Sequence, residues 1–224
     1  MNAAPPTARF QIEHQPRRPG YAIRYAVIGI THMDFLTEHE LQDAVIANAA
    51  DIEYPDVGVI RNVRFSAESG RVDIMLLPAE GLHRIVLIEA KRHSAADAPD
   101  KVVGQLLKYY AHALTLGTRG VERYREYAMA NPNASQDNEK TTPHKVLGGL
   151  SGPEVWQQLA EGRQLQPQEI GLYLAFDGHP SSVLKQIITV LDVHHNLRIG
   201  AIQVAHDRAR ILTGAHFTKS LWPT

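Results

Sequence analysis

The segment Ile85-Val86-Leu87-Ile88-Glu89-Ala90-Lys91 constrains the fold most strongly. Its first four residues are apolar without alternation, which is typical of a central strand covered on both faces of a sheet. A second, mostly apolar run, Arg71–Leu77, precedes it, and a turn around Gly81 separates the two. Such a strand needs cover on both faces of its sheet, and the alternation of strand-like and helix-like patterns along the chain indicates a mixed α/β domain.

The rest of the chain alternates between strand-like and helix-like patterns. Predicted strands cover Tyr21–Ile30, Val57–Phe65, Arg71–Leu77, Arg84–Lys91, Ile170–Phe176 and Leu197–Val204. Predicted helices cover Thr37–Ala50, Pro99–Leu116, Glu154–Ala160 and Pro180–Val193. The expected core order is helix, three strands, helix and strand, followed by a further helix and strand.

Length and composition favour a single folded unit. The chain has 224 residues, of which 44% are hydrophobic and 21% charged, enough to bury one substantial core. We expect a flexible segment over residues 1–20 and one domain over 21–224. Within that domain, the polar and glycine-rich stretch at about 129–152 predicts an exposed insertion.

Charge and cysteine content exclude several classes of protein. The formal net charge is -1, so no global basic field attracts nucleic acid or an anionic membrane. The chain has no cysteine, which excludes disulfides, thiolate zinc sites and a cysteine nucleophile. The apolar stretch Tyr21–Ile30 is too short to span a membrane and contains Arg24, so we expect a cytoplasmic protein without membrane contact.

Two carboxylates and a lysine interrupt the apolar strands. A hairpin symmetric about Gly81 places Asp73 opposite Glu89, with their Cβ atoms roughly 5 Å apart on one face. Lys91, two residues after Glu89, projects from that same face. A register slip of one residue would send Asp73 to the other face, so the prediction depends on the register.

Two buried carboxylates at that distance need a positive charge between them. Lys91 is one source, and a buried salt bridge of Asp73, Glu89 and Lys91 is the structural alternative. A hard divalent cation is another, because Mg²⁺ and Mn²⁺ prefer carboxylate oxygens and share their coordination with phosphate.

The first predicted helix supplies a third carboxylate. Thr37-Glu38-His39-Glu40 is a capping box, which accounts for Glu40 structurally. Glu38 falls within the apolar arc of the helix, so we expect it to face the core and to contribute to the acidic site. An acidic residue in a first helical turn is also favoured by the helix dipole alone, which leaves a structural alternative open.

The second predicted helix carries a polar stripe along the edge of its apolar face. The stripe comprises Lys101, Gln105, Lys108, Tyr109 and His112. Such a stripe is either a solvated helix border or, beside an acidic metal site, a lining for a phosphate backbone.

Together these residues resemble the PD-(D/E)XK nuclease superfamily over residues 37–116, with Ile170–Phe176 as a fourth core strand. The matching positions are Glu38 on a helix, Asp73 on a strand, Glu89-Ala90-Lys91 on the next strand, and Gln105 and Tyr109 on the following helix. Val72 stands where the name of the signature has proline. The resemblance implies a restriction-endonuclease-like core: a central mixed β-sheet flanked by helices, here with an N-terminal strand extension and a C-terminal helix–strand extension.

The resemblance also implies a Mg²⁺-dependent DNA endonuclease in which Mn²⁺ can substitute. Asp73, Glu89 and the carbonyl of Ala90 are then expected to hold the metal, with Glu38 contributing directly or through water. Lys91 is expected to orient or deprotonate the attacking water and to stabilise the transition state. Gln105 is expected to position the site, and Tyr109 to contact the nucleic acid backbone.

A local basic surface has to replace the missing global charge. Its candidates come from the same segments: Arg61, Arg64, Arg71, Arg92, Lys101 and Lys108. DNA is the expected partner, RNA is the other nucleic acid that fits, and a homodimer suits cleavage of both strands. Two alternatives stay open: a nuclease-fold module that binds nucleic acid or a protein without cutting, and a Schiff-base enzyme that uses a neutral Lys91.

Overall fold

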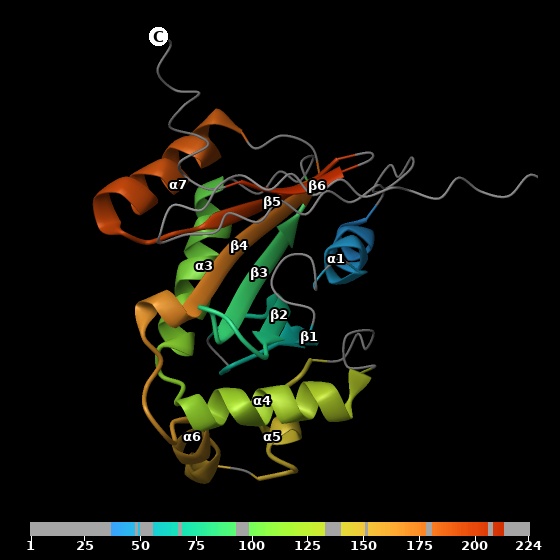
Figure 1. Cartoon of the computed structure of the whole chain (residues 1–224), viewed down its shortest axis with the longest axis vertical. Helices are drawn as coiled ribbons and strands as arrows, with labels where there is room; N and C mark the ends of the chain where they lie inside the picture. Colours follow the sequence, from blue (N-terminus) through green and yellow to red (C-terminus); the bar gives the residue numbers. More distant parts are fainter. Residues whose placement is uncertain are drawn as a thin grey trace, which may run out of the picture.

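The computed structural model describes residues 37–47, 49, 56–66, 69–92, 99–132, 140–150, 152–177, 181–205 and 208–212. Within them the chain has an α/β fold in which a mixed sheet packs against helices (Figure 1). The sheet contains β1 (Val57–Val63), β2 (Val72–Pro78), β3 (Ile85–Lys91), β4 (Ile170–Asp177) and β5 (Gly200–Ala205), and β6 (Arg208–Leu212) extends it at one edge.

The strands lie side by side in chain order. Antiparallel pairs join β1 to β2 and β2 to β3. Parallel pairs join β3 to β4 and β4 to β5, and β6 returns antiparallel to β5. Because β3 is the central strand of the first five, its residues are covered on both faces, as the apolar run Ile85–Ile88 predicts.

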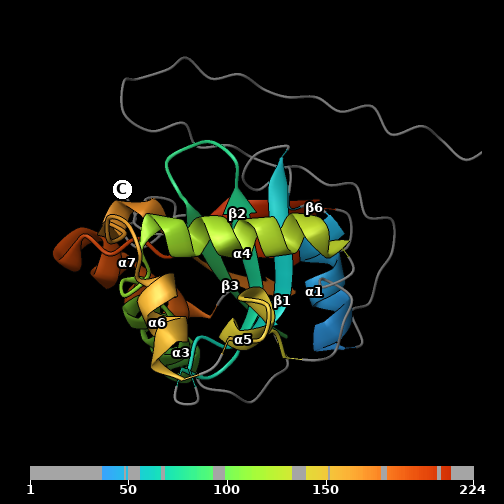
Figure 2. The same ribbon diagram turned by 90° about the horizontal axis from the view of Figure 1, so that it is seen from below.

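Helices cover the sheet unequally. Helix α1 (Glu38–Ala47) packs on one face, over Ile74, Leu76, Val86 and Ile88. Helices α3 (Pro99–Ala113), α4 (Thr118–Ala130) and α7 (Ser182–His195) contribute to the larger core on the other face. Figure 2 shows α4 lying across β1 and β2, and the short helices α5 (Pro143–Val146) and α6 (Pro153–Leu159) pack beside it.

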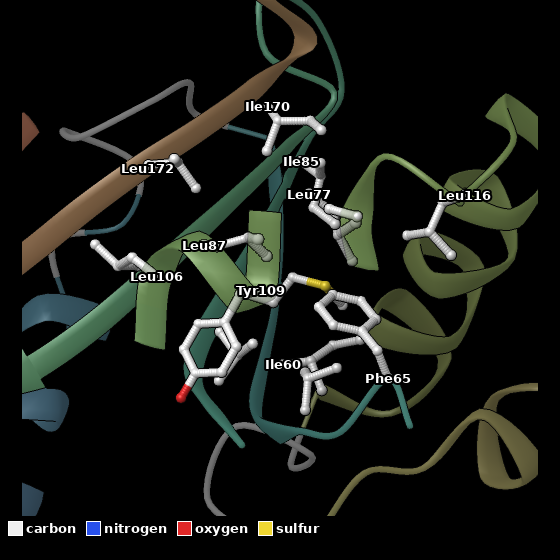
Figure 3. Packing of buried hydrophobic residues seen from close by; sticks show 14 of the residues in the cluster. Ile60, Phe65, Leu77, Ile85, Leu87, Leu106, Tyr109, Leu116, Ile170 and Leu172 are labelled. Carbon is white, nitrogen blue, oxygen red and sulfur yellow. The ribbon is translucent and has the colours of Figure 1, made fainter. Parts of the chain in front are cut away.

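The larger core brings the strands together with α3 and α4. Figure 3 shows Phe65, Leu77, Leu87 and Leu106 in this apolar cluster, with Tyr109 at one side and its hydroxyl oxygen pointing away from the cluster. The ring of Tyr109 therefore belongs to the core, while its hydroxyl group is available to polar partners at the edge of the core.

The predicted hairpin register is confirmed. Ile74 pairs with Ile88, Met75 with Leu87 and Leu76 with Val86, which is the register that is symmetric about Gly81. The predicted fourth core strand, Ile170–Phe176, is confirmed as β4, and the structure shows that it runs parallel to β3, from Ile85↔Ile170 to Lys91↔Phe176.

The longest helix that was not predicted is α4. Thr118–Ala130 forms α4, and its buried residues Val121, Tyr124 and Ala128 have helical spacing. The sequence analysis ends a helix at Leu116 and assigns no element to residues 118–128, in which polar residues dominate. In the structure, Gly117 precedes the first turn of α4, where its amide bonds to the carbonyl of Leu159 at 2.9 Å.

The exposed insertion predicted at about 129–152 is wrong in part. Met129 and Ala130 complete α4, residues 143–146 form α5, and Thr141 is buried. Residues 133–139 of this stretch lie outside the described part of the chain, as do the N-terminal segment 1–20 and the predicted strand Tyr21–Ile30. In the described parts of the chain, no helix is long and apolar enough to cross a membrane.

Candidate active site

The candidate site lies where β2 and β3 separate. Their ladder of paired residues ends at Ile74↔Ile88, and the same register places Asp73 opposite Glu89 at the next position. There, Oδ2 of Asp73 accepts a hydrogen bond of 2.9 Å from the backbone amide of Ala90. The carboxylate therefore binds the β3 backbone at the point where strand pairing stops.

Both carboxyl groups are withdrawn from solvent. Asp73 and Glu89 are each 2% exposed. Burial raises the pKa of Asp73 to about 6, although the Ala90 amide and the charge of Lys91 oppose the shift. Burial and the charge of Asp73 raise the pKa of Glu89 to about 8. The pair therefore favours holding a proton, or a cation in its place, at neutral pH.

Lys91 supplies positive charge beside this pair. Its Nζ donates to Glu38 Oε1 at 3.0 Å and lies 3.3 Å from Glu89 Oε1. Burial by itself would lower the pKa of Lys91, but the charge of Glu89 and the hydrogen bond to Glu38 outweigh it and leave the pKa raised. Lys91 therefore stays protonated, which opposes the Schiff-base alternative.

Glu38 reaches the site from α1 and contacts Lys91. The capping box is confirmed: the amide of Glu40 donates to Thr37 Oγ1 at 3.2 Å, and Glu40 Oε2 accepts from the amide of Thr37 at 2.9 Å. This cap fixes the first turn of α1, and Glu38 in that turn contacts Lys91. Among the described residues, no three His, Asp or Glu side chains converge as a metal cage. The role of Glu38 as a metal ligand stays a prediction.

Tyr109 supports the site from α3. Its hydroxyl group donates to the backbone carbonyl of Arg71 at 2.6 Å and lies 3.2 Å from Glu89 Oε2. Burial, together with the charges of Glu89 and Asp73, raises the pKa of Tyr109, so the hydroxyl keeps its proton. The side chain is 1% exposed, which does not fit the expected contact with a nucleic acid backbone. Tyr109 instead ties the start of β2 to Glu89.

Gln105 lies one helical turn before Tyr109 on α3. Its Oε1 atom is buried, and in the described structure it makes no hydrogen bond. A buried amide oxygen without a donor is costly, so this atom is suited to accept a hydrogen bond from a ligand or water.

The predicted basic surface is realised only in part. Arg71, Lys101 and Lys108 are exposed and Arg64 and Arg92 are half-buried, so five of the six predicted residues are accessible. Arg61 is different, because its guanidinium group is buried and contacts Asp43 and, at 3.2 Å, His39 Nδ1 of α1. Arg61 was wrongly assigned to the surface: it ties α1 to β1.

The donor set suits a hard divalent cation. Asp73 and Glu89 provide carboxylate oxygens at adjacent positions on two strands, and Ala90 follows Glu89 with a backbone carbonyl. Oxygen donors of this kind match Mg²⁺ or Mn²⁺, which retain several waters and need few protein ligands. The raised pKa values of both carboxyl groups are the property expected of a site that is completed by a cation.

Sequence reasoning did not single out Asn62 on β1. Its backbone is left-handed, with φ of 54°, and the flanking pairs Arg61↔Ile74 and Val63↔Val72 place it opposite Asp73. The tolerance of asparagine for this conformation is the only signal in the sequence, and it is a weak one.

Comparisons with protein-family models, with curated proteins and with solved structures find no match.

Proposed function

We propose that this chain is a Mg²⁺-dependent nuclease that hydrolyses phosphodiester bonds in DNA, built on a restriction-endonuclease-like core. The observation that carries the proposal is the meeting of Asp73, Glu89 and Lys91 where β2 and β3 separate. The order of strands and helices around these residues supports it too, because α1 brings Glu38 and α3 brings Tyr109 to the same place.

Asp73, Glu89 and the carbonyl of Ala90 would hold the metal, and Glu38 would join them directly or through water. When bound, Mg²⁺ offsets negative charge on the phosphate and lowers the pKa of water toward neutrality. The bond to Ala90 fixes one oxygen of Asp73, and Tyr109 fixes one oxygen of Glu89. Partners of this kind orient ligating carboxylates and restrict their motion.

Lys91 acts as a hydrogen-bond donor and a positive charge. Its raised pKa keeps it protonated, so it orients the attacking water and stabilises charge on the phosphate oxygens, and it is not suited to accept a proton. Glu38 accepts a hydrogen bond from Lys91 Nζ and so helps to hold the Lys91 side chain. In the reaction the water oxygen loses a proton to solvent and forms a bond to phosphorus, one P–O ester bond breaks, and the leaving oxygen takes up a proton.

DNA binding would depend on local charge. Arg71 and Lys108 are exposed, Arg92 directly follows Lys91, and the net charge of the whole chain is -1. On duplex DNA, a plot of log affinity against log salt concentration should have a slope of about −0.9 for each phosphate contacted. Because few phosphates would be contacted, we expect a shallow slope.

A second candidate is a nuclease-fold module that binds without cutting. It is favoured by the two contacts of Lys91 with Glu38 and Glu89, which partly neutralise the acidic residues without a metal. Binding of Mn²⁺ separates the candidates, because a self-sufficient salt bridge has no need of a cation.

The test is cleavage of labelled single-stranded DNA, duplex DNA, branched DNA and RNA, with Mg²⁺, Mn²⁺ or EDTA. The variants are Lys91→Ala and Asp73→Asn, with Lys185→Ala on α7 as a control that removes a lysine elsewhere. We expect metal-dependent cleavage by the wild type and by the control, and a loss of at least 100-fold in the two site variants, typical of removing a catalytic group. Absence of cleavage on every substrate, without Mn²⁺ binding, would refute the proposal.

A further inference from the structure

Asn62 adopts an unusual backbone conformation for the interior of a strand. Its φ is 54°, whereas a regular strand has a strongly negative φ. Among the described residues, the other non-glycine with positive φ is Asn196, which follows the last turn of α7. A helix end commonly uses this conformation, but a strand does not, so Asn62 requires a local explanation.

The position of Asn62 connects it to the candidate site. The pairs Arg61↔Ile74 and Val63↔Val72 flank Asn62 on β1 and Asp73 on β2, so these two residues face each other across the two strands. Asp73 therefore lies between Asn62 on one neighbouring strand and Glu89 on the other.

The regular alternation of side chains breaks at this pair. In a regular strand, residues three apart point to opposite faces. Ile60 and Val63 nevertheless belong to the same core, under α3 and α4, and so do Val72 and Met75. Both strands thus change face around Asn62 and Asp73, and the left-handed residue is the element of β1 that permits the change.

The chain fixes this irregularity from outside the sheet. The amide of Thr141 donates to the carbonyl of Asn62 at 3.1 Å, and the amide of Arg64 donates to the carbonyl of Thr141 at 3.0 Å. Thr141 is 3% exposed. These two bonds hold the backbone on both sides of Val63. The change of face at Asn62 is therefore fixed by hydrogen bonds to Thr141.

We propose that Asn62 is a positioning residue whose left-handed backbone, held by Thr141, aims Asp73 at the Ala90 amide and at the metal position. Because β2 pairs with β1 on both sides of Asp73, a change in the course of β1 shifts the Asp73 carboxylate. The inference rests on the proposed function of Asp73. It assigns a role in the site to β1, a strand that carries no predicted metal ligand.

The test compares Asn62→Ala with Asn62→Gly. Alanine disfavours positive φ, whereas glycine adopts it readily, so the pair separates the backbone from the side chain. Asn196→Ala is the matched control, because it imposes a similar backbone strain at the end of α7. The readouts are Mn²⁺ affinity by calorimetry, kcat and KM on the best DNA substrate, and Tm.

For Asn62→Ala we expect about tenfold weaker Mn²⁺ binding and about tenfold lower kcat, with KM for DNA nearly unchanged, as for other losses of support to a metal ligand. Asn62→Gly should restore both values to within about twofold of the wild type. Asn196→Ala should lower Tm to a similar extent and leave Mn²⁺ affinity and kcat unchanged.

Wild-type Mn²⁺ affinity and kcat in Asn62→Ala would overturn the inference while leaving the proposed function intact. Equal losses in Asn62→Gly and Asn62→Ala would also overturn it, because the side chain would then be the essential part. If Asn62→Ala does not fold, the inference is tested on Asn62→Gly alone. Wild-type Mn²⁺ affinity and kcat in Asn62→Gly would support it, and weaker binding or a lower kcat would refute it. A wild type that neither binds Mn²⁺ nor cleaves would refute the proposed function, and this inference with it.

Discussion

The carboxylate of Asp73 accepts a hydrogen bond of 2.9 Å from the amide of Ala90, two residues beyond Ile88, the last β3 residue that pairs with β2. This bond ties the acidic side chain on β2 to the residue whose carbonyl is expected to join it on the metal. It also explains how two strands can separate inside a buried sheet without leaving the Ala90 amide unpaired, which would carry a free-energy cost.

Replacement of Glu89 by glutamine should stabilise the metal-free protein while abolishing cleavage. The folded-state pKa of Glu89, about 8, lies above its ordinary value of 4.5, so the folded protein retains a proton that the unfolded chain has lost between these pH values. The free energy of unfolding of the wild type therefore falls as pH rises from about 4.5 to 8. Glu89→Gln should not show this fall, because glutamine does not titrate.

Thermal melts in EDTA at pH 5 and pH 8.5 measure this effect. At the higher pH we expect the free energy of unfolding of Glu89→Gln to exceed that of the wild type by on the order of 2 kcal/mol. Each kcal/mol corresponds to a rise of about 2–4 °C in Tm. Little gain should be seen at pH 5. The control variant is Glu122→Gln, which replaces an exposed glutamate on α4. A variant less stable than the wild type at both pH values would contradict the pKa shift.

Removal of the Tyr109 hydroxyl should impair the site more than the fold. Tyr109→Phe keeps the buried ring but loses the bond to the Arg71 carbonyl and the contact with Glu89. We expect kcat to fall by about 10- to 100-fold, as for other partners of metal-ligating residues, with a loss of about 1 kcal/mol in stability.

The neighbouring variant Tyr110→Phe is the control, because that hydroxyl makes no contact with the acidic residues in the described structure. Steady-state kinetics and a urea unfolding curve measure both quantities for each variant. An unchanged kcat in Tyr109→Phe would show that Glu89 is held in place without this contact.

Two glycines in the helices on the larger-core side should respond oppositely to alanine. A Cβ on Gly120 of α4 would lie 2.0 Å from the backbone carbonyl oxygen of Leu159, so the helix would have to move away from α6. We expect Gly120→Ala to lower the free energy of unfolding by about 2–4 kcal/mol. Gly104 of α3 is exposed, and nothing lies within 4 Å of a Cβ there, so Gly104→Ala should gain about 0.5–1 kcal/mol from helix propensity.

Chemical denaturation of both glycine variants checks this contrast. A Gly120→Ala variant as stable as the wild type would mean that the backbones of α4 and α6 do not approach as closely as the structure shows. The same preparations should cleave DNA normally wherever they are folded, since neither glycine contacts the site.

The sequence predicted the central hairpin well because its constraints are local. Uninterrupted apolar strands and a short turn at Gly81 fix a register, and the register brings Asp73 opposite Glu89. The capping box at Thr37 was recoverable for the same reason, since it depends on residues three apart.

Helix α4 and the role of Arg61 depended on tertiary context. The apolar residues Val121, Tyr124 and Ala128 are too sparse to stand out among polar neighbours, and α4 becomes helical by packing on β1 and β2. Arg61 looked like a surface charge because its partner Asp43 lies 18 residues away on α1. Asn62 and Thr141 come together only in the folded chain, so no spacing rule connects them.

The central claim is that Asp73 and Glu89 hold a divalent cation in place of a proton. The most direct measurement is calorimetric titration of Mn²⁺ at pH 7 in two buffers of different ionisation enthalpy, for the wild type and for Asp73→Asn. We expect the wild type to bind Mn²⁺ and to release about one proton, because a ligating carboxylate must be deprotonated. Asp73→Asn should bind Mn²⁺ at least tenfold more weakly. Equal Mn²⁺ affinities in the two proteins, or no binding in either, would contradict it.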